Sequence, residues 1–90
     1  MATGKGTTTV DFGTGKTDVS VAVSAVGITT EAVEAWIVPA LTASNTVDNH
    51  WVEELTVIAG QADSGVGFRI YLKCRNGLAH GVYNVGWVYA

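Results

Sequence analysis

Residues 16–26 constrain the fold more strongly than any other part of the chain. Within this segment Val19, Val21, Val23 and Ala25 alternate with small, mostly polar residues. Successive side chains of a β-strand point to opposite faces, so this strict alternation predicts a strand with one buried, valine-lined face. Because a lone strand leaves its backbone polar groups unpaired, the chain must supply further strands beside it.

Several other segments carry a strand pattern. Residues 67–75 alternate apolar and polar side chains and run into Asn76 and Gly77, the strongest short-range signal for a hairpin turn. Residues 31–38 also alternate, and Pro39 ends them after a length that suits a strand better than a helix. The remaining predicted strands are residues 9–12, 53–59 and 82–89, with a polar loop at residues 40–49.

The predicted architecture is all-β. Six or seven short strands, eleven glycines, one proline and no convincing helical periodicity indicate an antiparallel β-sandwich, jelly-roll-like in form, or a small barrel. Ninety residues are enough chain for one domain. We expect residues 1–8, which are small and polar with two glycines, to form a flexible N-terminal arm, and residues 9–90 to form the single β-sandwich domain.

The composition predicts contact with a partner protein. Charged residues are 14% of the chain, against roughly 25% in typical soluble domains. A small surface with so few charges is expected to be covered in part, most simply by another copy of the chain. Cys74 is the only cysteine, which excludes an internal disulfide.

Charge and hydropathy also bear on other partners. A net charge of −3 argues against nucleic-acid binding, and no apolar run approaches the roughly 20 residues of a membrane-spanning helix. The N-terminus lacks the apolar core of a signal peptide, so we expect the chain to be made and first folded in the cytoplasm.

The densest group of polar, titratable and aromatic side chains lies around residue 50. Its members are Asp48, His50, Trp51, Glu53 and Glu54. Adjacent strand residues point to opposite faces, so the two glutamates cannot act as a paired acid and base. The candidate ligands of a zinc site would be the two histidines, His50 and His80, with Cys74, Asp48 or Glu53. The spacing of these residues matches no zinc motif. The sequence therefore predicts no catalytic residue, no metal and no cofactor, and His50 and Trp51 are predicted to pack at a junction between loop and strand.

The last two predicted strands offer a candidate surface. One strand places four polar or aromatic side chains on a single face, and the next supplies further aromatics: Arg69, Tyr71, Lys73 and Arg75, beside Tyr83, Trp87 and Tyr89. Aromatic residues with arginine are typical anchors of protein interfaces, and aromatic rings also stack on sugars. A subunit interface, ordinary core and surface, and a sugar platform are three alternatives at this point.

The order of motifs resembles a group of small proteins and domains encoded among the structural genes of tailed bacteriophages. After the valine-rich strand, the motifs are Val-Glu-Ala-Trp-Ile-Val-Pro, Asp-Asn-His-Trp-Val-Glu-Glu-Leu, Gly-Val-Gly-Phe-Arg-Ile-Tyr and Gly-Val-Tyr-Asn-Val-Gly-Trp-Val. The resemblance covers residues 7–90 and rests on this order, without a catalytic signature.

The resemblance implies a non-enzymatic virion component with a β-sandwich fold that forms a homotrimer and binds phage capsid or tail proteins. Because the chain starts at Met1 and ends on a predicted strand, we expect a complete small gene product, which favours a capsid-decorating or head-fibre protein over the tip of a tail fibre. The arm that docks on the capsid would be Thr3, Gly4, Lys5, Gly6 and Thr7. Asp48 and His50 would tie the long loop to the following strand.

An alternative function is a carbohydrate-binding module for host attachment. Its stacking platform would be Trp51, Tyr71 or Trp87, and its partner would be a host surface glycan. No membrane or nucleic-acid partner is expected for either a virion structural protein or a carbohydrate-binding module.

Overall fold

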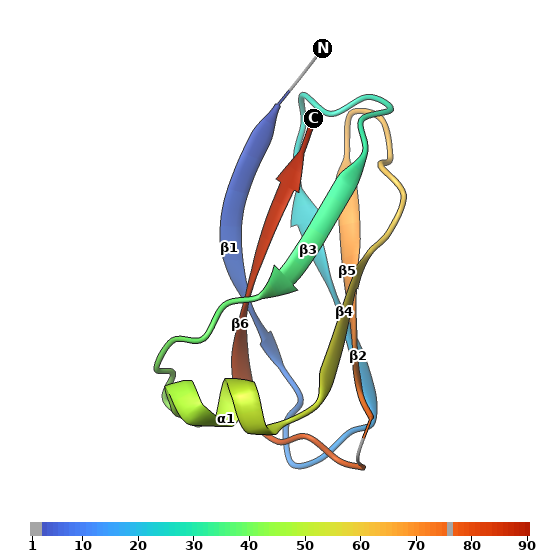
Figure 1. Ribbon diagram of the computed structural model, residues 1–90. Coiled ribbons are helices and arrows are strands. Elements are labelled where there is room, and N and C mark those ends of the chain that lie inside the picture. Colours follow the sequence, from blue (N-terminus) through green and yellow to red (C-terminus); the bar gives the residue numbers. More distant parts are fainter. Residues whose placement is uncertain (1–2, 76) are drawn as a thin grey trace.

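Six β-strands and one short helix make up the part of the chain that the computed structural model describes, residues 3–75 and 77–90 (Figure 1). The elements are β1 (Gly4–Asp11), β2 (Asp18–Ser24), β3 (Val33–Ile37), α1 (Val47–Val52), β4 (Leu55–Ala59), β5 (Gly67–Cys74) and β6 (Val82–Tyr89). They form two three-stranded antiparallel sheets, with strand orders β1-β6-β3 and β2-β5-β4. The prediction of a small all-β antiparallel fold is confirmed.

One hydrophobic core takes side chains from both sheets. Sheet β1-β6-β3 contributes Val10, Tyr83 and Val85, and sheet β2-β5-β4 contributes Ile70 and Leu72, all of them almost fully buried. Alternation along β5 decides which side chains enter this core, as the sequence predicts. Each large apolar side chain that is buried in this way stabilises the fold by about 1.5–3 kcal/mol relative to exposure.

Residues 1 and 2 of the predicted flexible arm (residues 1–8) lie outside the described residues, and for residues 4–8 the prediction was wrong. Residues 4–8 belong to β1, which pairs with the whole of β6 from Gly4 opposite Tyr89 to Asp11 opposite Val82. A Cβ atom on Gly4 would lie 2.5 Å from the ring of Tyr89, and one on Gly6 would lie 2.6 Å from the ring of Trp87. The glycines that made the segment resemble an arm therefore leave room for aromatic rings of the neighbouring strand.

The predicted loop at residues 40–49 and the strand predicted from residue 53 also need correction. Residues Val47–Val52 form α1, and β4 begins only at Leu55. Thr46 caps the helix because its hydroxyl accepts a hydrogen bond from the Asn49 N–H at 3.2 Å. Six residues are too few to produce a recognisable helical period, so tertiary contacts decide this element.

The turn between β4 and β5 depends on glycine. Gly67 has a φ of +146°, and a Cβ atom there would lie 1.9 Å from the backbone carbonyl oxygen of Val23 on the adjacent strand β2. Gly65 has a φ of +75° with open space around it. The two glycines allow residues 60–66 to turn back over the end of the sheet.

Candidate functional site

His50 lies at a structural junction between α1 and β6. Its ring is 2% exposed, its Nδ1 atom lies 2.8 Å from the Thr46 carbonyl oxygen, and its Nε2 atom lies 3.1 Å from the Asn84 backbone nitrogen. A carbonyl can only accept and a backbone N–H can only donate, so these partners fix a neutral ring with its proton on Nδ1. Both ring nitrogens are thereby occupied, and His50 has no nitrogen left for a metal or a substrate.

The same junction shields the edge of β6. β3 ends at Ile37, so the Val82–Asn84 part of β6 has no strand beside it on that side. The loop before α1 takes the place of a strand, because the Thr42 hydroxyl and the Asn45 side-chain amide both donate to the Val82 carbonyl oxygen, each at 2.9 Å. His50 adds a further hydrogen bond to this edge, because its Nε2 atom accepts from the Asn84 N–H.

Tyr83 packs edge-on against the His50 ring, with centroids 5.0 Å apart. Burial raises the pKa of the Tyr83 phenol above its ordinary value, and electrostatic interaction with Glu53 and Cys74 raises it further. The phenol is therefore held neutral inside the core, which is a structural role.

Two of the predicted junction residues do not take part in these contacts. Asp48 lies exposed in the first turn of α1, and Trp51 is 70% exposed. The expected tie from Asp48 and His50 to the following strand is replaced by a tie from His50 alone to β6, which lies more than 30 residues further along the chain. A hydrogen bond between two residues so far apart in the chain leaves no recognisable pattern in the sequence around either of them.

The residues considered for acid–base or metal chemistry do not form a site. Glu53 and Glu54 precede β4, and a Glu53 carboxylate oxygen lies 3.7 Å from the Cys74 sulfur. His80 lies apart from them, exposed beside Gly15. Among residues 3–75 and 77–90, no group of three His, Cys, Asp or Glu side chains is arranged to hold a metal ion.

The side chains that were predicted to form one stripe on the last two strands lie on different surfaces of the two sheets. Arg69, Tyr71 and Lys73 are exposed on the outer face of β2-β5-β4, as the alternation predicts. Trp87 and Tyr89 belong to the other sheet and face the core, where both contact the buried Phe68 ring. The two sets cannot serve as one surface, and Trp87 is not available as a sugar platform.

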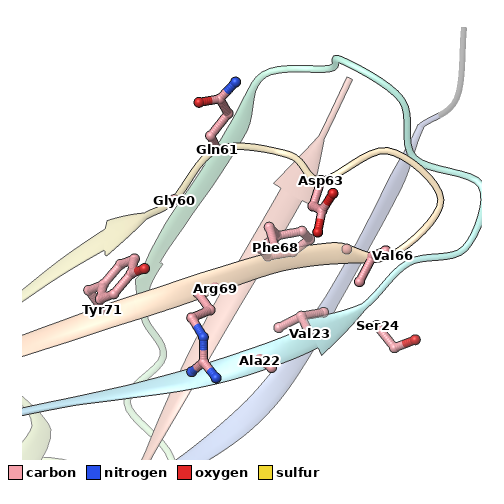
Figure 2. A pocket seen from close by; sticks show the side chains of 11 residues that line it. Ala22, Val23, Ser24, Gly60, Gln61, Asp63, Val66, Phe68, Arg69 and Tyr71 are labelled. Atoms are coloured by element: carbon pink, nitrogen blue, oxygen red, sulfur yellow. The ribbon is translucent and has the colours of Figure 1, made fainter.

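An open hollow of about 500 Å³ lies on the outer face of β2-β5-β4, next to the turn from β4 to β5 (Figure 2). Arg69 pairs with Ala22 on one side and lies beside Gly60 on the other, where the Gly60 N–H donates to the Arg69 carbonyl oxygen at 2.7 Å. Neighbours with little or no side chain leave free space on both sides of the arginine. The sequence does contain a signal for this hollow, because Ala22 and Gly60 occupy positions that face outward. Only the register of the strands shows that these two residues lie on either side of Arg69.

Polar and aromatic groups line the hollow. The Arg69 guanidinium donates to the Ser20 hydroxyl at 2.9 Å, and the Tyr71 ring, 49% exposed, lies against Gly60. Gln61 and Asp63, on the turn after β4, also line the hollow, and Figure 2 shows Asp63 pointing toward Phe68 and Gln61 pointing away from Arg69. This set can bind a polar ligand by stacking and hydrogen bonding, but it contains no nucleophile with an adjacent base.

A second exposed group lies on α1. Val47 and Trp51 are four residues apart, which places them on the same side of the helix, and they are 43% and 70% exposed. Val52, next to Trp51, is also 70% exposed. His50 is buried and holds the helix through its hydrogen bonds, so the apolar side chains are presented on a fixed support.

The fold and these surfaces define a small all-β domain with two candidate contact regions, the α1 apolar group and the Arg69–Tyr71 hollow. Comparison with protein-family models, curated proteins and solved structures gives no match. None of the helices formed by residues 3–75 and 77–90 is long and apolar enough to cross a membrane.

Proposed function

We propose that this chain is a non-enzymatic structural protein of a bacteriophage virion, which self-associates and attaches to the particle through exposed apolar side chains. The order of its motifs resembles such proteins from residue 7 to residue 90. Its particle-facing partner would be a capsid or tail protein. The homotrimer that the resemblance implies remains a prediction, and the mass of the protein in solution tests it.

The observation that carries the attachment surface is the presentation of Trp51. A tryptophan that is 70% exposed is costly to leave in water, and binding hot spots are enriched in this residue. Because the neighbouring His50 fixes α1 through both ring nitrogens, little conformational freedom would be lost when Trp51 binds. A rigid anchor of this kind favours attachment to a preformed partner surface.

Purified particles of the phage that encodes the chain provide the test. We expect mass spectrometry to detect the protein in washed particles, and we expect a Trp51→Ala variant to be lost from them while it still folds. Tyr71→Ala is the matched control, because it removes an exposed aromatic ring from the other candidate region. Particles that never contain the protein, or that retain both variants equally, would contradict this attachment.

A second candidate function is glycan binding at the Arg69–Tyr71 hollow. It is favoured by a half-exposed ring beside a guanidinium, a hydroxyl, an amide and a carboxylate, which together provide a stacking surface with hydrogen-bonding groups. A glycan array tests it directly. Signals that Tyr71→Ala abolishes and Trp51→Ala preserves would support glycan recognition at this hollow, and an array without signals would dismiss it.

A further inference from the structure

The outer edge of β1 carries backbone groups that no other strand within residues 3–75 and 77–90 pairs. β1 is the first strand in the order β1-β6-β3, so only one of its two edges faces β6. In an antiparallel pair, alternate residues direct both their N–H and their C=O toward the neighbour, and the residues between them direct both away. The question is which residues of β1 face outward.

The hydrogen bonds of β6 show which residues of β1 face outward. The Val38 N–H donates to the Asn84 carbonyl oxygen at 3.0 Å, so the backbone of Asn84 faces β3. Thr9 is the register partner of Asn84 and must therefore direct its own N–H and C=O away from β6. The Phe12 N–H, three residues later, donates to the Gly81 carbonyl oxygen at 2.9 Å, which gives the same alternation. Lys5, Thr7, Thr9 and Asp11 accordingly present their backbone groups at the open edge, and all four side chains are exposed.

Apart from the charges of Lys5 and Asp11, this edge lacks the features that usually prevent strand addition. β1 is eight residues long, against five for the edge strands β3 and β4, and its register with β6 is continuous, without a bulge. It contains no proline, and its side chains that face the core carry no charge. Natural proteins usually shorten, bend or charge such an edge.

The side chains along the edge are complementary to themselves. When two β1 strands run antiparallel with Thr8 at the centre, Lys5 of one copy lies opposite Asp11 of the other, and Thr7 lies opposite Thr9. All these residues face the open edge, so each facing pair exchanges two hydrogen bonds, or about eight in total. A shift by two residues in either direction loses the Lys–Asp pairs. The other long edge strand, β2, has seven residues, of which Asp18 is the only charged one, so it offers no such register.

We propose that two copies of this chain associate through their β1 strands, antiparallel and in the register that pairs Lys5 with Asp11. The two sheets then become one six-stranded sheet with the order β3-β6-β1-β1-β6-β3, related by a two-fold axis at Thr8. The observations behind this contact do not rest on the phage proposal, but a two-fold dimer and the homotrimer that the sequence resemblance implies exclude each other as the state of the protein in solution.

Sedimentation equilibrium of the full chain tests the proposal. An interface formed mainly by one strand pair is small, so we expect a weak dimer whose population rises with protein concentration. Two charge reversals then separate this register from any other contact. Lys5→Asp places Asp opposite Asp, Asp11→Lys places Lys opposite Lys, and each is expected to weaken the homodimer about tenfold or more.

An equimolar mixture of the two variants gives the sharpest result. In a mixed dimer each facing pair is again of opposite charge, so the mixture should associate about as tightly as the original chain although neither variant does so alone. Lys16→Asp is the control, because it makes the same charge change at an exposed residue outside β1 and should leave association unchanged.

The Asp11 side chain also accepts a hydrogen bond from the Gly13 N–H at 2.7 Å, so Asp11→Lys is checked by its unfolding curve. Asp11→Asn, which keeps that acceptor, serves if Asp11→Lys does not fold, and it should weaken the dimer less than a reversal. A monomer at 1 mM, a trimer, or a dimer that responds equally to Lys5→Asp and Lys16→Asp would overturn the proposal.

Discussion

Replacement of His50 tests whether the junction between α1 and β6 is needed for stability. His50→Leu keeps an apolar body in the buried space but removes both hydrogen-bonding nitrogens. The Asn84 N–H then has no acceptor, which costs about 1–3 kcal/mol for a buried donor. Loss of the bond to the Thr46 carbonyl adds about 0.5–1.5 kcal/mol, and loss of the edge-on contact with Tyr83 about 0.5–1.5 kcal/mol.

Together these contributions predict a loss of about 2–6 kcal/mol in the free energy of unfolding, a large part of the roughly 5–15 kcal/mol available to a domain. His50→Gln is the matched variant, because its amide oxygen can occupy the position of Nε2 and still accept from Asn84. It should lose about half as much. Trp51→Ala, at the exposed neighbour, should change stability by less than about 0.5 kcal/mol.

Urea unfolding followed by circular dichroism gives the free energies, and amide hydrogen exchange reports the contact itself. We expect the Asn84 amide to be protected in the original protein and in His50→Gln, and to exchange much faster in His50→Leu. A loss below about 1 kcal/mol for His50→Leu, or unchanged protection of that amide, would refute the role assigned to His50.

Three further perturbations have definite expected results. Gly67→Ala forces a methyl group onto the Val23 carbonyl oxygen and should cost at least about 3 kcal/mol by urea unfolding, whereas Gly65→Ala, with open space, should cost about 1 kcal/mol. Thr46→Ala removes the cap of α1 and should lower stability by about 1 kcal/mol, with a matching loss of protection in the helix amides. Because the pKa of Tyr83 is raised in the folded protein, its contribution is fully present below about pH 10 and is lost as pH rises beyond the ordinary value of 10.0. Tyr83→Phe should flatten this alkaline fall in stability, and a fall of unchanged steepness would contradict the assignment.

The strands that alternate strictly could be placed from sequence. Residues 82–89 coincide with β6, and residues 67–75 and 16–26 contain β5 and β2 with their buried faces as predicted. Each of these segments carries enough alternating positions for period two to outweigh other patterns. The inward position of Cys74 followed from the same rule.

The elements that were predicted wrongly have weak local patterns. Residues 4–8 contain two glycines and no apolar alternation, yet they pair with β6 because its aromatic rings occupy the space above those glycines. α1 is a single short helix held by a histidine that hydrogen-bonds a distant strand. In both cases the stabilising partner is remote in sequence, so propensity and periodicity near the segment carry no information about it.

The same distinction applies to the candidate surfaces. The sequence by itself determined that Arg69, Tyr71 and Lys73 share an outward face, since side-chain direction alternates along any strand. Only the tertiary structure decided that Trp87 and Tyr89 turn inward from the other sheet, that Ala22 and Gly60 leave a hollow beside Arg69, and that β1 has an open edge. Alternation is a property of one strand, whereas register, sheet order and the pairing of edges depend on which strands meet.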